Sequence, residues 1–215
     1  MNLLIARHGE TPWNKEGRYQ GHTDIPLSAD GEAQARALGE RLRNTRIDRA
    51  VASPLVRARR TAELALGDRA NLLTLDADLV EISHGAWEGK LASDIEASDP
   101  ALLHSWRNTP SADLAAGPGA ESLGQVTTRA WRALQNAAAG LGPDDTLLLV
   151  AHDAVNRALI CKIMGLPLER VWSFQQSPAT LNALTGPTLD ALQVVRLNDA
   201  SHHSDVFAAA AHRAL

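Results

Sequence analysis

Two predicted strands of this 215-residue chain end in a histidine. An apolar run at residues 3–6 stops at Arg7 and His8, and a second at residues 146–151 stops at His152. Open α/β sheets place their chemistry just outside the carboxyl ends of their strands. An imidazole at such a position is a candidate nucleophile, and a neighbouring guanidinium is a ready partner for an anion. An isolated Arg-His pair would favour the simpler interpretation of a basic surface turn.

An arginine and a glutamate extend this set. Ser53, followed by proline, favours a helix start directly after the predicted strand at residues 48–52, so Arg57 falls in the first helical turn. If the two strands before the arginines are parallel neighbours, both guanidinium groups converge on one edge of the sheet. Glu81 lies in residues 79–89, a segment without a clean hydrophobic period. The simpler interpretation of that segment is a packed loop with a surface glutamate.

Together these five residues suit phosphoryl transfer through a phosphohistidine. A neutral imidazole would attack phosphorus, and the arginines would orient and neutralise the phosphate through paired donors. A second, protonated histidine would stabilise the charge that grows on the phosphoryl oxygens. A carboxylic acid with a raised pKa would protonate the leaving alkoxide. This chemistry requires no metal and no other cofactor.

A long polar loop follows the first predicted strand, at residues 9–27. Loops of this length are uncommon in compact domains unless they have a function. Asn14, Gln20 and Gly21 are its candidate binding residues, because side-chain amides and a closely approaching backbone suit an oxyanion.

Predicted strands and helices alternate along the chain, which favours one α/β domain over residues 1–215 with a mainly parallel sheet. Besides the apolar runs already given, further strands are expected at residues 72–75 and 192–197. The expected helices are at residues 28–44, 53–66, 92–107 with a break at Pro100, 121–140 and 153–164.

Composition excludes several classes of protein. A net charge of -4 argues against a nucleic-acid partner, because proteins that bind nucleic acids usually carry a broad basic face. No apolar run approaches the roughly 18 residues of a membrane span, and the first residues lack the features of a signal peptide. A cytoplasmic protein without a membrane partner is therefore expected. The single cysteine, Cys161, excludes an internal disulfide and a cysteine-based zinc site, and its apolar surroundings predict a buried thiol.

Five sequence segments in order resemble the histidine phosphatase superfamily, also called the phosphoglycerate mutase-like family. The match reaches about residue 203, and several motifs in the right order are specific where one would be weak. The resemblance implies a three-layer α/β/α sandwich. The segments are Arg-His-Gly-Glu-Thr at residues 7–11, Gln-Gly at 20–21, Ser-Pro-Leu-Val-Arg-Ala at 53–58, residues 79–89 ending in Trp-Glu-Gly, and Val-Ala-His at 150–152.

The resemblance also implies roles for the matched residues. His8 would be the phosphorylated nucleophile, and Glu81 would donate a proton to the leaving group and then act as base for water. The phosphate pocket would be formed by Arg7, Arg57 and His152, with further contacts from Asn14 and from Gln20 or the Gly21 backbone.

Asp153 departs from the family pattern, which usually has glycine after the second histidine. A carboxylate near a phosphate dianion would repel it. We favour an N-cap of the following helix, since Asp is among the best capping residues. The alternative is a contact with a hydroxyl or amine of the substrate. His22 and His84 are interpreted as loop or core histidines, and His202 lacks partners at metal-ligand spacing, so no metal site is predicted.

The leading hypothesis is a phosphomonoesterase that hydrolyses a small phosphorylated metabolite. A cofactor-dependent phosphoglycerate mutase is the second, but the stretch from Glu81 to His152 is short for a mutase and residues 81–85 read Glu-Ile-Ser-His-Gly, not Glu-Arg-His-Tyr-Gly. A non-catalytic phosphate-binding module is the third, kept open by Asp153. The substrate is not specified by the sequence. The quaternary state is left open as well: dimers are common in the family, so the resemblance makes a homodimer possible without specifying it.

Overall fold

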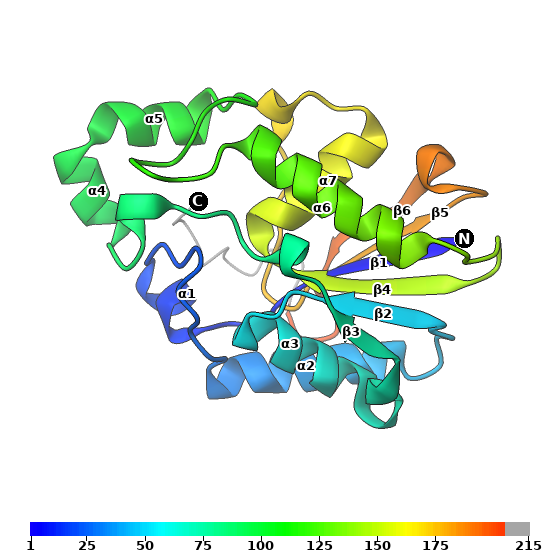
Figure 1. The fold of residues 1–215 in the computed structure, drawn as a ribbon. Coiled ribbons are helices and arrows are strands. Elements are labelled where there is room, and N and C mark those ends of the chain that lie inside the picture. The colour runs from blue at the N-terminus through cyan, green and yellow to red at the C-terminus, as the bar shows by residue number, and fades with distance from the viewer. Residues whose placement is uncertain (205–215) are drawn as a thin grey trace.

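The computed structural model describes residues 1–204, which fold around one six-stranded sheet (Figure 1). The strand order is β3-β2-β4-β1-β5-β6. The first four strands in this order are parallel, whereas β5 and β6 are antiparallel to their neighbours. The mainly parallel sheet is thus confirmed. The strands are β1 (Asn2–Arg7), β2 (Arg49–Ala52), β3 (Leu73–Leu75), β4 (Thr146–Ala151), β5 (Leu181–Thr185) and β6 (Gln193–Asp199).

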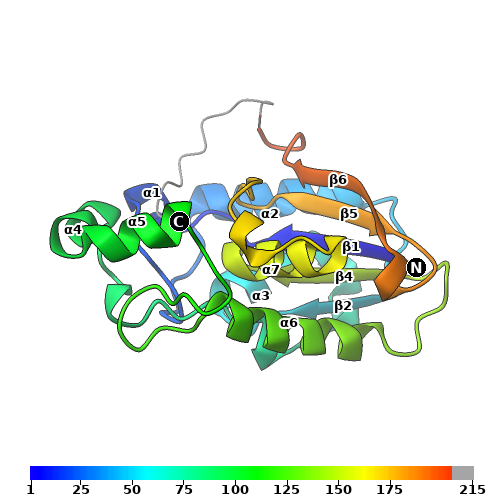
Figure 2. The ribbon, with the colours of Figure 1, turned by 90° about the horizontal axis from the view of Figure 1, so that it is seen from above.

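Helices cover both faces of the sheet and confirm the three-layer α/β/α sandwich (Figures 1 and 2). One face is covered by α2 and α3, the other by α6 and α7, while α1, α4 and α5 lie beyond the end of the sheet (Figure 2). The helices are α1 (Pro12–Glu16), α2 (Ala29–Leu42), α3 (Val56–Leu66), α4 (Ala92–Ser98), α5 (Pro100–Asn108), α6 (Leu123–Ala138) and α7 (Asp153–Met164).

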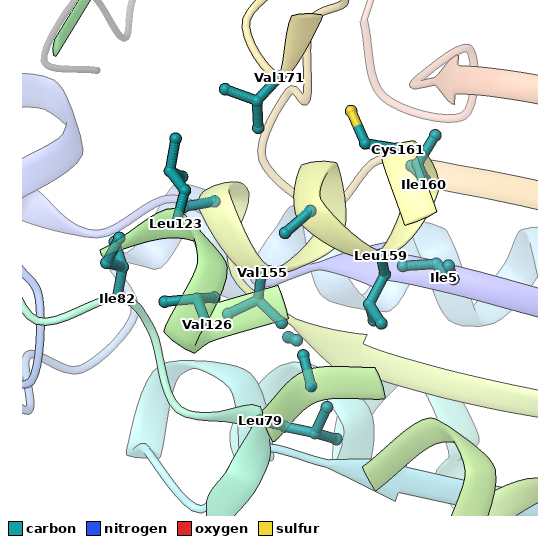
Figure 3. Packing of buried hydrophobic residues seen from close by; sticks show 14 of the residues in the cluster. Ile5, Leu79, Ile82, Leu123, Val126, Val155, Leu159, Ile160, Cys161 and Val171 are labelled. Carbon is teal, nitrogen blue, oxygen red and sulfur yellow. The ribbon is translucent and has the colours of Figure 1, made fainter. Parts of the chain in front are cut away.

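Alternation along β1 explains why both faces are apolar. Leu3 and Ile5 pack with α6 and α7, whereas Leu4 and Ala6 pack with α2 and α3. Successive side chains of a strand point to opposite faces, so a continuous apolar run supplies two cores. Figure 3 shows the larger core, where Ile5 lies near Leu159 of α7. Cys161 belongs to this core, as predicted, and burial raises the pKa of its thiol to about 11.

The register of the parallel strands brings the chemical residues to one edge. Arg7 pairs with Ala151, so His8 and His152 follow neighbouring strands at the same level. β4 lies between β1 and β2. The strands before the two arginines are therefore not direct neighbours, but both end at this edge.

One local prediction is wrong, and one strand is missed. The helix expected to open at residues 53–54 begins at Val56, and no side chain caps it. The hydroxyl of Ser53 contacts His152 instead. The antiparallel strand β5 was not predicted, because buried polar Asn182 interrupts its apolar pattern.

The other expected strands and helices are confirmed, including the break at Pro100 between α4 and α5. The loop expected at residues 9–27 is interrupted by the short helix α1, which is capped by the Thr11 side chain. Among the helices of residues 1–204, none has the length and apolar character needed to cross a membrane. The single domain expected over residues 1–215 extends past the part that the structure describes.

Candidate active site

His8 directly follows β1, and one nitrogen of its imidazole ring makes a hydrogen bond to the backbone. Its Nδ1 lies 2.7 Å from the backbone oxygen of Gly9. A carbonyl oxygen can only accept, so in the neutral ring Nδ1 carries the proton and Nε2 holds the lone pair. His8 is 2% exposed and lines a pocket at the sheet edge. The geometry therefore identifies Nε2 as the basic nitrogen of the ring.

The two arginines line the same pocket and are fixed by backbone oxygens. Arg7 donates to Gln176 O at 2.5 Å, and Arg57 donates to the carbonyls of Gly21 and Thr23 at 2.8 and 2.9 Å. Burial lowers the pKa of Arg57 to about 10, which still leaves a cation at neutral pH. Nε of each arginine is buried without a protein partner. Two buried guanidinium groups with open donors are a strong anion site.

His152 does not itself line the pocket, but its ring lies next to that of His8, with ring centroids 5.2 Å apart. It is fully buried and its Nε2 lies 2.8 Å from the Ser53 hydroxyl. Burial, and then the charges of Arg57 and His8, hold the pKa of His152 well below its usual range. In the free site this lowered pKa favours the neutral ring. The protonated second histidine expected beside a bound phosphate stays a prediction.

Glu81 supplies the carboxyl group of the pocket. It is 5% exposed, and burial raises its pKa, with the charge of Asp153 acting in the same direction. A hydrogen bond from Ile82 N, at 2.9 Å, and the charge of Arg57 oppose this shift. The expected surface glutamate of a packed loop is therefore excluded. A carboxyl group with a raised pKa can hold a proton near neutral pH and donate it.

Polar side chains hold the backbone around Glu81. Arg129 of α6 donates to the carbonyl oxygens of Asp78, Val80 and Glu81 at 2.7, 2.6 and 3.0 Å. His22 Nε2 lies 2.9 Å from Glu81 O, and Glu121 joins Arg129 in a 2.9 Å ion pair. Burial alone would raise the pKa of Glu121, but hydrogen bonds from His22 and Arg129 outweigh it and lower this pKa to about 2. His22 is therefore a structural contact, in line with its predicted role.

The three residues expected in the loop at residues 9–27 all line the pocket, although Asn14 lies in α1. Asn14 and Gln20 line it, and their side-chain oxygens both lie 3.0 Å from the Thr11 hydroxyl. Gly21 has φ +54° and presents its carbonyl oxygen to Arg57. A Cβ at this position would lie 2.1 Å from Glu88 Oε1. Gly21 therefore positions an arginine through its carbonyl group.

Asp153 does not cap α7, so that prediction is wrong. The N-cap is His152, and Asp153 is the first helical residue. Its carboxylate accepts from Arg157 Nε at 2.7 Å, one turn along the helix, and lies 4.0 Å from Arg7. It also lines the pocket, at 3% exposure. Arg157 offsets the repulsion that an isolated carboxylate would exert on a phosphate.

Three further residues line the pocket without having been predicted: Arg18, Tyr19 and His84. His84 is buried between the rings of Tyr19 and Trp106, and burial lowers its pKa to about 4. It was interpreted as a core or loop histidine. Its position three residues after Glu81 is the signal that could have placed it beside the site.

No metal centre is present in the part of the chain that the structure describes: no three His, Cys, Asp or Glu side chains gather closely enough to hold an ion. His202 instead packs edge-on against the ring of His203.

Comparison with known proteins agrees with this geometry. A family model, the histidine phosphatase superfamily (branch 1), matches residues 3–200. Phosphoserine phosphatase 1 of Hydrogenobacter thermophilus is 33% identical over 175 residues, 81% of each chain. A probable phosphoglycerate mutase, GpmB, of Salmonella choleraesuis is 34% identical over 169 residues, 78% of this chain and 76% of that one. The structure of a mycobacterial glucosyl-3-phosphoglycerate phosphatase with VO3 has a TM-score of 0.83 at 29% identity, covering 92% of this chain and 98% of the other.

Proposed function

Because the chain belongs to the histidine phosphatase superfamily (branch 1), we propose that it is a phosphomonoesterase acting through a phosphohistidine on His8. The observation that carries this proposal is the orientation of the His8 ring. Its Nδ1 is held by the Gly9 carbonyl, which leaves Nε2 as the nucleophile in a pocket that also contains Arg7 and Arg57.

The first chemical step forms a bond from His8 Nε2 to phosphorus and breaks the bond from phosphorus to the ester oxygen. Glu81, protonated because its pKa is raised, gives its proton to that oxygen as the alcohol leaves. In the second step water attacks phosphorus, Glu81 takes a proton from the water, and the phosphorus–nitrogen bond breaks to release orthophosphate. The two arginines and His152 stabilise the negative charge on the oxygens of the phosphoryl group during its transfer. No step needs a metal ion.

Asn14, Gln20 and Gly21 complete the binding site in this proposal. Asn14 and Gln20 line the pocket, and Gly21 acts by holding Arg57. Asp153 is included among the substrate-binding residues because it lines the pocket and its carboxylate lies 4.0 Å from the Arg7 guanidinium group.

The proposed substrate is a small phosphorylated metabolite. The relatives named above act on phosphoserine and on glucosyl-3-phosphoglycerate, which are both small anionic monoesters. A phosphoglycerate mutase is the second candidate, because the Salmonella relative carries that name. In a mutase the phosphoryl group would return from His8 to a second hydroxyl and not to water.

A phosphate-release screen tests the proposal. The full chain is incubated with phosphoserine, phosphoglycerates, sugar phosphates and p-nitrophenyl phosphate, in EDTA, with mutase turnover of 3-phosphoglycerate assayed alongside. We expect release from one or a few esters and none with His8→Ala. Mutase turnover without net release would favour the second candidate. Release that EDTA abolishes, or that His8→Ala retains, would contradict the proposed mechanism.

A further inference from the structure

Ser53 directly follows β2 at the edge of the sheet where the pocket lies, and its side chain is fully buried. Its backbone N–H donates to Val150 O at 3.1 Å, which fixes it beside the end of β4. Its hydroxyl oxygen has two neighbours among the described residues: Leu55 N at 3.3 Å and His152 Nε2 at 2.8 Å. The helix that it was expected to cap begins without it.

The donors and acceptors around the Ser53 hydroxyl determine which neighbour receives its proton in a hydrogen bond. A hydroxyl has one proton and two lone pairs. The Leu55 N–H can only donate, so it occupies a lone pair. In the described part of the chain, the hydroxyl proton has no acceptor other than His152 Nε2. A buried O–H without an acceptor is unfavourable, so the hydroxyl donates and Nε2 accepts.

This arrangement decides the tautomer of His152. The ring is neutral in the free protein, because burial holds its pKa well below the usual range. A neutral imidazole has one proton, and when Nε2 accepts a hydrogen bond that proton is on Nδ1. Nδ1 is buried and has no protein partner. The alternative tautomer would leave both the Ser53 proton and the Nδ1 lone pair buried without a partner.

We infer that Ser53 is a positioning residue, which fixes His152 in the Nδ1–H tautomer so that this neutral ring donates to the phosphoryl group next to His8. The inference rests on the proposed function for the identity of the acceptor, but the tautomer itself is a property of the free protein. It explains how a histidine that is unprotonated in the free protein still supplies a hydrogen-bond donor. A buried donor without a partner gains a hydrogen bond only when an anion arrives.

The test is a long-range ¹H–¹⁵N spectrum of the full chain with ¹⁵N-labelled histidine, with His152 assigned by its loss in His152→Gln. We expect a protonated Nδ1 and an unprotonated Nε2, unchanged between pH 6 and 8. Added inorganic phosphate should shift the Nδ1 signal. In Ser53→Ala the proton should move at least partly to Nε2, and kcat should fall by about tenfold to 100-fold, with KM less affected.

Ser122→Ala is the matched control. Ser122 caps α6 by accepting from Gln125 N, so its loss costs stability of a similar order without touching His152. This variant should keep the wild-type tautomer and kcat. A proton on Nε2 in the wild type, or an unchanged tautomer in Ser53→Ala, would overturn the inference. An Nδ1–H tautomer in a protein that releases no phosphate would leave the inference standing and contradict the proposed function.

Discussion

The two sides of the pocket are held in place by different means. On one side is His8, with the ring of His152 next to it. The two residues directly follow β1 and β4, whose paired register fixes their backbones. On the other side, Glu81 and His84 lie in a segment outside the sheet. Side chains hold that segment: Arg129 and His22 bind the backbone oxygen of Glu81.

This difference separates two kinds of sensitivity. A residue at the end of a buried strand is positioned by backbone hydrogen bonds and by the core, which no single polar substitution removes. A residue held by a few side chains loses its position when one of them is replaced. Remote substitutions should therefore reduce catalysis mainly through the Glu81 side, where the proton is transferred.

The largest effect is expected from Glu81→Gln, which removes the transferable proton and keeps the shape of the side chain. kcat for an alkyl phosphate should fall by about 100-fold to 10,000-fold. The loss for p-nitrophenyl phosphate should be much smaller, because its leaving group is stable without a proton. In the wild type, raising the pH through the raised pKa of Glu81 should lower kcat for the alkyl ester only. Equal losses for both esters would contradict the role of Glu81.

The next effect is expected from Arg129→Ala, which removes the donor to three backbone oxygens beside Glu81. A small displacement of the acid can cost as much as about 100-fold in rate, so kcat should fall by about tenfold to 100-fold. The control is Arg132→Ala, on the same helix, whose 60% exposed side chain pairs with Asp78. That variant should keep kcat and lose at most about 1 kcal/mol of stability. Similar losses of kcat in both variants would refute the distinction between the two sides.

The free energy of unfolding should depend on pH because of His84, the buried histidine on the Glu81 side of the pocket. The folded pKa of His84, about 4, lies below its unfolded value of 6.5, so the folded state binds fewer protons on acidification. Stability from this group is complete above pH 6.5 and is lost as the pH falls towards 4. At pH 5 the loss should be about 2 kcal/mol.

Urea unfolding at pH 7 and pH 5 measures this loss. His84→Gln should show a smaller drop between the two values than the wild type. His104→Gln changes an exposed imidazole of α5 and should keep the wild-type drop. An undiminished drop in His84→Gln would show that other groups, such as His152, account for the acid sensitivity.

The smallest effect is expected from a pair of glycine substitutions. Both Gly17 and Gly21 have positive φ, but a Cβ at Gly17 meets nothing within 4 Å, whereas one at Gly21 meets Glu88 at 2.1 Å. Gly17→Ala should cost about 1 kcal/mol through backbone strain alone. Gly21→Ala should cost more, and it should raise KM because the Gly21 carbonyl holds Arg57. Thermal unfolding and steady-state kinetics check both, and equal costs would contradict the close contact with Glu88.

The strand side of the pocket was the more predictable from sequence. The run at residues 146–151 is apolar throughout and is followed at once by His152, so both the strand and the place of the histidine could be predicted. Strand β5 could not be predicted, because it contains a buried polar residue, Asn182. The side chain of Asn182 forms hydrogen bonds with Gln176 and with the Ile5 carbonyl, and the sequence pattern predicts neither contact.

The errors at Ser53 and Asp153 have a common cause. Both residue types favour the start of a helix, so local pattern alone predicts a cap. In the fold, each side chain has a better partner: His152 for Ser53 and Arg157 for Asp153. The Arg157 partner stands at the i+4 spacing and could have been read from the sequence. The partner of Ser53 depends on β2 lying beside β4, which only the sheet order reveals.

The most direct test of the mechanism is to trap the phosphorylated protein. An ester from the active set, labelled with ³²P, is mixed with the full chain in EDTA, quenched in base within milliseconds and digested for peptide mapping. We predict a base-stable, acid-labile label on His8, absent from His8→Ala and more persistent in Glu81→Gln. No label during turnover, or a label on another residue, would contradict the phosphohistidine mechanism.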